Sequence, residues 1–81
     1  YQVTVLFDPS CRWRLVEEYG ADRFTTEPDG RLRFTGGFPD ADSVLSWELT
    51  FGDKAELVEP EELREQLGQL AETLAHRYRR D

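Results

Sequence analysis

The segment from Trp47 to Tyr78 constrains the fold of this chain most strongly, because it joins a helix end, a glycine turn, a short strand and a final helix in one continuous run. Gly52 lacks a Cβ atom and can adopt the left-handed conformation that ends a helix. An apolar strand follows over residues 55–58. Pro60 then suits the first turn of another helix, where its missing N–H group has no partner to lose. The sequence therefore predicts a helix, a reversal, a strand and a second helix.

The final helix carries one apolar stripe whose members recur at steps of four, three, four and four, as one face of an α-helix requires. The stripe comprises Leu63, Leu67, Leu70, Leu74 and Tyr78. We expect it to need a partner surface.

Charges are divided between the two ends of the same helix. Glu59, Glu61 and Glu62 stand at its start, and Arg77, Arg79 and Arg80 stand at its end. This order complements the helix dipole. We therefore interpret the acidic cluster as support for the helix and not as a metal site or a pair of catalytic carboxylates.

The first part of the chain predicts a strand, a helix and a hairpin. Gln2 to Phe7 alternates apolar and polar residues, as a half-buried strand does. A helix over Cys11 to Tyr19 follows and ends at Gly20. The turn Pro28-Asp29-Gly30 separates two further strands, Arg23 to Glu27 and Arg31 to Phe34, and so predicts an antiparallel hairpin.

A second helix follows the hairpin. Either Asp40 or Asp42 can cap it. Its predicted apolar surface comprises Val44, Leu45, Trp47 and Leu49. The complete order is βαββαβ with a final helix, which predicts an α+β fold of the ferredoxin-like type: four antiparallel strands with helices on one face.

The 81 residues are enough for one small domain, which we assign to residues 1–81. The chain starts at Tyr1 without an initiator Met, so we expect it to be excised from a longer protein.

A family resemblance rests on the pattern W-x-L-x-F-G-x-x-A-x-L-V-x-P-x-x-L, which begins at Trp47 and is followed by a helix with a late tyrosine. Together with the initial V-T-V-L-F strand and the D-G hairpin, it resembles the C-terminal extension (WCX) domain of bacterial WYL-domain transcriptional regulators. The resemblance implies a non-catalytic regulatory and assembly domain. It also implies partners: a WYL domain of the same or another chain, a second copy in a homodimer, and DNA bound by a helix-turn-helix domain outside these residues. We expect no cofactor, and we expect a cytoplasmic location because the sequence has no signal-peptide pattern and a single cysteine.

Three arginines suggest a different function. Arg23, Arg31 and Arg33 fall within the predicted hairpin, where they would share the outer face of the sheet. Guanidinium groups bind phosphates and carboxylates, so this face could hold single-stranded nucleic acid or a small anionic effector. The competing interpretation is a solvated face on which the arginines pair with Glu27 or Glu56 across strands.

Trp13 stands between Arg12 and Arg14 on the first predicted helix, off its apolar stripe. Large aromatic residues and arginines carry much of the energy of protein interfaces. We therefore predict a protein interface at these three residues, with partial burial of Trp13 at the helix edge as the alternative. Trp47, in contrast, is expected in the core.

Composition excludes several other classes. The net charge of −7 disfavours strong nonspecific binding of nucleic acid by the whole domain. A single Cys11 and a distant His76 are too few for a zinc site, and the chain shows neither a catalytic constellation nor an apolar run that could span a membrane. We expect no enzyme activity, no metal and no membrane contact.

Overall fold

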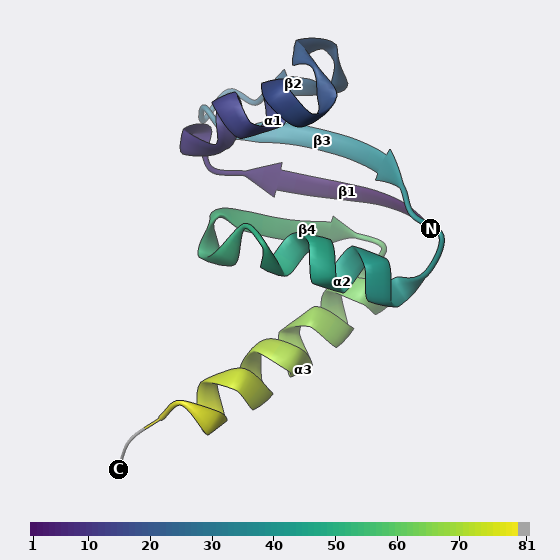
Figure 1. The fold of residues 1–81 in the computed structure, drawn as a ribbon, viewed down its shortest axis with the longest axis vertical. Helices are drawn as coiled ribbons and strands as arrows, with labels where there is room; N and C mark the ends of the chain where they lie inside the picture. Colours follow the sequence, from purple (N-terminus) through teal and green to yellow (C-terminus); the bar gives the residue numbers. More distant parts are fainter. Residues whose placement is uncertain (80–81) are drawn as a thin grey trace.

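The computed structural model describes residues 1–79; Arg80 and Asp81, and with Arg80 one of the predicted helix-end charges, lie outside the described residues. Residues 1–79 form four strands and three α-helices (Figure 1). In chain order these are β1 (Gln2–Phe7), α1 (Arg12–Tyr19), β2 (Phe24–Thr26), β3 (Leu32–Gly37), α2 (Ala41–Leu49), β4 (Ala55–Glu59) and α3 (Glu61–Arg77). Short 3-10 turns occupy Pro9–Cys11, Ala21–Arg23 and Gly52–Lys54.

The strands form one open sheet in the order β2-β3-β1-β4, and each neighbouring pair is antiparallel. β3 therefore lies between β1 and β2, the two strands that α1 connects. β1 lies in the same way between β3 and β4, which α2 connects. The predicted α+β class, with a four-stranded antiparallel sheet and a C-terminal helix, is confirmed. The narrower ferredoxin-like description stays a prediction.

The two faces of the sheet differ. Alternate residues of β1 and β3 are buried, and they point to the face that α1 and α2 cover (Figure 1). The buried apolar side chains of the strands are Val3, Val5, Phe7, Phe24, Leu32, Phe34 and Leu57. Outside the strands, the core also contains Cys11, Leu15, Val44, Phe51 and Leu63. Since apolar burial is the main driving force for folding, the covered face holds most of the stability of the domain.

The hairpin forms around the predicted turn. The backbone N–H of Glu27 donates to the carbonyl of Arg31 at 2.7 Å, and Gly30 adopts a φ of 92° that suits glycine. Its strands are shifted relative to the prediction, because β2 begins at Phe24 and β3 extends to Gly37. Arg23 belongs instead to the 3-10 turn before β2.

Helix α2 is rotated relative to the predicted apolar surface. Val44 is buried as expected and Trp47 is half-buried, but Leu49 is 40% exposed. Glu48 points inward in its place and is only 3% exposed. Asp40, and not Asp42, caps this helix by accepting a hydrogen bond from the Ser43 N–H at 2.8 Å.

Trp47 anchors an aromatic cluster in the core. Its ring packs against those of Phe7, Phe38 and Phe51, with centroid separations of 5.8, 5.0 and 5.4 Å. Its indole N–H donates to the Tyr19 hydroxyl at 2.8 Å, which satisfies the polar end of the side chain. The expected core position of Trp47 is confirmed.

The reversal after α2 uses Gly52 with a φ of 62°, so its left-handed conformation is confirmed. The helix itself ends at Leu49, earlier than the predicted run through Phe51, and Gly52 opens a 3-10 turn.

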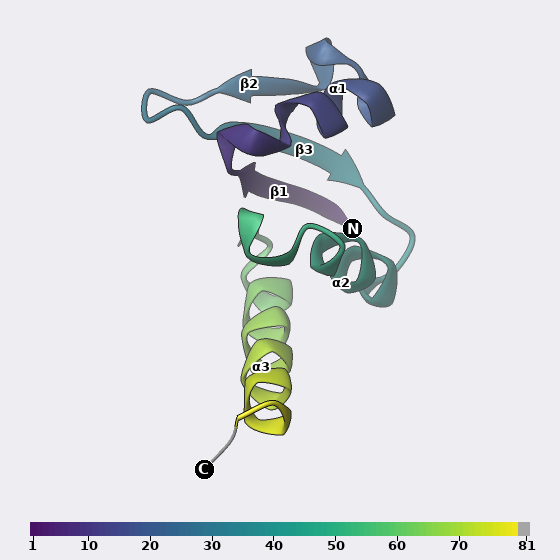
Figure 2. The same ribbon diagram turned by 60° about the vertical axis from the view of Figure 1, so that its left-hand side comes forward.

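Helix α3 projects away from the sheet (Figure 2). Leu63, at its base, is fully buried against the core, whereas Tyr78, just past its end, is 82% exposed. Leu67, Leu70 and Leu74 between them are half-buried. The expected stripe is thus present; Leu63 and, in part, Leu67 pack against the core, and the contact decreases toward Tyr78.

Candidate functional site

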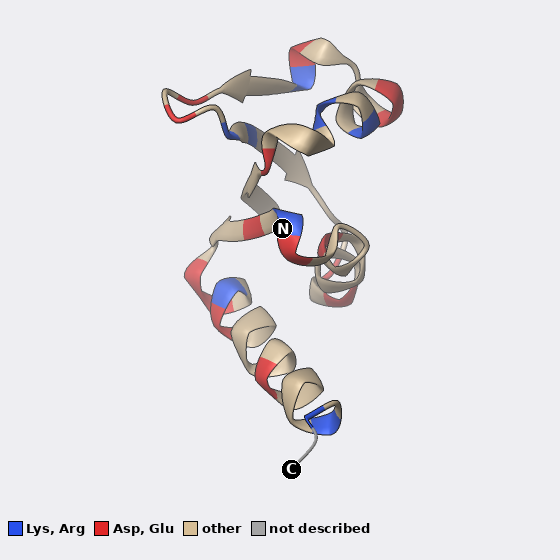
Figure 3. Cartoon of the chain, turned by 90° about the vertical axis from the view of Figure 1, so that its left-hand side faces the viewer, with Lys and Arg blue, Asp and Glu red and all other residues tan. Residues whose placement is uncertain are grey.

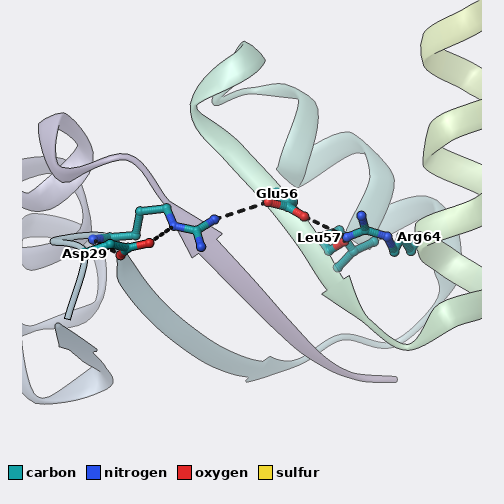
Figure 4. A network of polar contacts seen from close by, with 5 residues as sticks. Asp29, Glu56, Leu57 and Arg64 are labelled. Atoms are coloured by element: carbon teal, nitrogen blue, oxygen red, sulfur yellow. Dashed lines mark hydrogen bonds and ion pairs between the residues drawn. The ribbon is translucent and has the colours of Figure 1, made fainter. Parts of the chain in front are cut away.

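The outer face of the sheet carries two of the three predicted hairpin arginines, and both are paired with carboxylates. Arg31 donates from Nε to Asp29 Oδ2 at 2.8 Å and from Nη1 to Glu56 Oε1 at 3.3 Å (Figure 4). Arg33 donates from Nε to Glu27 Oε1 at 2.6 Å. These are the cross-strand pairs of the competing interpretation, and they neutralise the positive charge that an anion would need.

Glu56 also connects this face to α3. Its Oε2 atom accepts a hydrogen bond from Arg64 Nη1 at 2.9 Å, and the same guanidinium donates to the carbonyl of Leu57 at 3.0 Å (Figure 4). Glu56 therefore bridges Arg31, beside the hairpin turn, and Arg64, in the first turns of α3. The pairs are exposed, so each contributes little stability alone. Their geometry links three elements through one side chain.

Arg23 does not join the other two arginines. Its guanidinium lies 5.3 Å from the Phe34 ring and 6.0 Å from the Tyr19 ring, and it donates to the Thr35 carbonyl at 3.4 Å. Its Nη2 atom also lies beside the inward-facing Gly36, 3.7 Å from where a Cβ atom on that residue would be, so Arg23 is on the covered side of the sheet. The predicted three-arginine surface is therefore wrong in its placement of Arg23, which lies at the edge of the covered face. Ligand capture by Arg31 and Arg33 stays a prediction, and the ion pairs argue against it.

Of the three predicted interface residues on α1, the two arginines bind within the domain and only Trp13 is exposed to a partner. Arg12 donates to Thr26 Oγ1 at 3.0 Å. Arg14 donates to the carbonyl and the hydroxyl of Thr50 at 3.0 and 2.9 Å, and it stacks 3.8 Å from the Phe51 ring. Both arginines thus fix α1 to its neighbours. Trp13 remains 77% exposed between them, and it is the member of the trio that is available to a partner.

Glu48 is the site that the sequence reading missed. It lines a cavity of about 280 Å³ between α2, β4 and α3, together with Leu57, Leu67, Gly68 and Ala71. Burial raises the pKa of Glu48 from 4.5 to about 7, and no partner among residues 1–79 offsets that shift. The signal was present in the sequence, since Glu48 follows the buried Val44 by four positions and precedes the buried Phe51 by three.

Cys11 and His76 show no chemical constellation. Cys11 is 7% exposed, and burial raises the pKa of its thiol, which disfavours the reactive thiolate. His76 is exposed in the last turn of α3. Within residues 1–79, no three His, Cys, Asp or Glu side chains are grouped to hold a metal ion. None of the helices in the same part of the chain has the length and apolar character needed to cross a membrane.

The comparison with protein families decides the identity. The family model for the WCX domain matches residues 1–75, from Tyr1, just before β1, into the last turns of α3. The chain belongs to the WCX domain family. A search of curated proteins finds no match. The residues of the WCX pattern serve the packing and the chain reversal of the domain. Trp47 and Phe51 lie in the aromatic cluster, Gly52 makes the reversal, and Leu57 and Leu63 are buried.

Proposed function

We propose that this WCX domain is the non-catalytic C-terminal regulatory and assembly domain of a bacterial WYL-type transcriptional regulator. The family assignment supports the regulatory context. DNA would be read by a helix-turn-helix domain elsewhere in the regulator, and effector binding would reach that domain as a change in how two chains pack.

One observation carries the assembly role. Helix α3 leaves the sheet with an apolar stripe that is fully buried only at Leu63; Leu67 packs partly against the core, and Tyr78 is 82% exposed. An amphipathic helix gains most of its stability from packing its apolar face. We therefore expect a partner surface along Leu70, Leu74 and Tyr78.

The Glu56 bridge supports a relay role for the same helix. Arg31 lies beside the hairpin turn and Arg64 lies near the base of α3, and both pair with one carboxylate. A neighbouring domain that displaced Arg31 would free Glu56 Oε1 from the hairpin side and leave Glu56 paired with Arg64 alone. The orientation of α3 would then respond to contact at the outer face of the sheet.

The test uses the full-length regulator and a variant with Glu56→Gln, which keeps the size of the side chain but removes its charge. We expect the variant to bind operator DNA and to lose most of its effector-dependent change in DNA affinity. Deletion of residues 1–81 should in addition abolish or weaken dimer formation, measured by sedimentation. An unchanged dimer and an unchanged effector response after the deletion would contradict the proposal.

A further inference from the structure

The cavity between α2, β4 and α3 holds Glu48, the only buried polar or charged side chain of residues 1–79. Glu48 is 3% exposed, and no group of the described residues forms a hydrogen bond with its carboxyl. Among the same residues, no fully enclosed side-chain oxygen lacks a hydrogen-bond partner. The Glu48 carboxyl is therefore not sealed in the core but borders the open space of the cavity. Because a buried carboxylate without a partner is unfavourable, a positive group placed beside it would be stabilising.

The rest of the inner wall is apolar and leaves room. Leu57 of β4 and Leu67 of α3 line it, and α3 presents the small residues Gly68 and Ala71 to the same space. A Cβ atom on Gly68 would meet nothing within 4 Å, and Gly68 does not adopt a positive φ, so the backbone gives no reason for glycine inside this helix. The volume of about 280 Å³ equals that of about nine water molecules in the liquid, which suits a ligand of about eight non-hydrogen atoms.

The outer end of the cavity is charged but balanced. Glu56 of β4 and Arg64 of α3 line it, and their side chains are 50% and 45% exposed, so the cavity opens to solvent beside them. The two side chains pair at 2.9 Å, and Arg64 also donates to the Leu57 carbonyl at 3.0 Å. Glu56 and Arg64 are the charged groups that line the cavity with Glu48 from β4 and α3. Since their charges cancel, ionised Glu48 is the uncompensated charge of the cavity.

The charge of the whole domain has the same sign. Its net charge is −7, and Figure 3 shows acidic residues on α1, α2, β4 and α3. A negative field raises the local concentration of cations and lowers that of anions. The local and the overall charge therefore both favour a positively charged ligand over an anionic one.

We propose that this cavity is a binding site for a small organic cation, a primary amine on an apolar body of about seven carbon atoms. The ammonium group would pair with the Glu48 carboxylate at the inner end, and the apolar body would pack against Leu57, Leu67 and Ala71. The site does not depend on the assembly role proposed above, because all of its lining residues belong to one chain.

Benzylamine is a suitable probe, because it has this size and carries a positive charge at pH 8. Benzyl alcohol and benzoate have a similar shape but are neutral and anionic. In titrations of the ¹⁵N-labelled 81-residue chain followed by NMR, benzylamine should shift the amide signals of residues around the cavity and saturate with a dissociation constant of about 1 mM. The alcohol should bind about tenfold more weakly or worse, and benzoate should not bind.

Two variants and the pH locate the contact. Glu48→Gln keeps the shape of the side chain without its charge and should weaken benzylamine binding by about tenfold or more, while the amide spectrum remains that of a folded domain. Ala71→Leu should fill the cavity and abolish binding, whereas Ala75→Leu, one turn further along α3 and outside the cavity, should not. Because the Glu48 pKa is about 7 and only the ionised carboxyl pairs with an amine, the affinity of the wild type should fall about thirtyfold from pH 8 to pH 5.5.

Three results would overturn the proposal. One is equal binding of benzylamine to the wild type and to Glu48→Gln, or no saturable shift at about 20 mM. Another is saturable binding of benzoate that is lost with Arg64→Ala, which would assign the cavity to anions. The third is binding of benzylamine only after Arg64→Ala, because Arg64 would then be the cation that Glu48 holds.

Discussion

Replacing Glu48 by glutamine should stabilise this domain, and the gain should depend on pH. Glu48 is 3% exposed and lines the cavity between α2, β4 and α3, whose other residues include Leu57, Leu67, Ala71 and, at its charged side, Glu56 and Arg64. Ionising a carboxyl in such surroundings is unfavourable, because water is removed and no positive group compensates. Glutamine has nearly the same shape and no charge.

The magnitude follows from the shift in the Glu48 pKa. The folded value of about 7 lies above the ordinary 4.5, so the folded state holds the proton more tightly than the unfolded state. Stability is therefore highest below pH 4.5, falls as the pH rises from 4.5 to 7, and is constant above. The full loss is about 3 kcal/mol, of which about 1 kcal/mol is reached by pH 5.

Urea unfolding followed by tryptophan fluorescence measures this effect, because Trp47 lies in the core and reports on packing. The free energy of unfolding of Glu48→Gln should exceed that of the wild type by an amount that grows by about 2 kcal/mol between pH 5 and pH 8. Any cost of burying the glutamine amide is the same at each pH, so the growth of the difference is the decisive quantity.

A difference that stays flat across this range would refute the reasoning, since it would mean that Glu48 titrates normally in the folded domain. A wild type that is more stable than the variant at pH 8 would also refute it. That result would require a cationic partner for the Glu48 carboxylate, such as Arg64, which lines the same cavity and pairs with Glu56 in the structure.

Further predictions concern the helix cap, the reversal and the paired arginines. Asp40→Ala should lower stability at pH 7 but have little effect near pH 2, and Asp40→Asn should keep the cap. The reason is that hydrogen bonds from Ser43 hold the pKa of Asp40 below its ordinary 3.8. The ionised cap therefore stabilises the folded state above pH 3.8, and this stabilisation is lost as the pH falls through the lowered pKa. Thermal unfolding at both pH values checks this. Gly52→Ala should cost about 1 kcal/mol in urea unfolding, because the φ of 62° is left-handed, and an unchanged stability would contradict it. A labelled single-stranded oligonucleotide should show no saturable anisotropy change with this domain, since Arg31 and Arg33 are neutralised by ion pairs. Binding that weakens with salt and disappears in the Arg31→Ala/Arg33→Ala variant would instead restore the ligand interpretation.

Local signals made part of the fold predictable. The hairpin turn depends on Gly30, and the reversal after α2 depends on Gly52, and each needs a conformation that few other residues adopt. The final helix was marked by a proline at its start and by the leucine stripe. These features depend on residues close together in sequence, so a single chain is enough to read them.

The errors arose where several elements meet. The rotation of α2 that buries Glu48 and exposes Leu49 is set by packing against β4 and α3, which periodicity within the helix does not record. Arg23 was placed on the outer face because the predicted strand began one residue too early; Arg23 lies in the 3-10 turn Ala21–Arg23, where the alternation of a strand does not apply. The pairing of Arg31 with Glu56 was one of two open alternatives, and only the sheet order brought these residues together.

The central claim is that this WCX domain assembles through surfaces that its own fold leaves uncovered. Sedimentation equilibrium of the 81-residue chain over a wide concentration range tests that claim most directly. The account predicts a concentration-dependent rise in mass from the 9.5 kDa of one chain toward twice that value. A mass that remains at 9.5 kDa at all concentrations would contradict it.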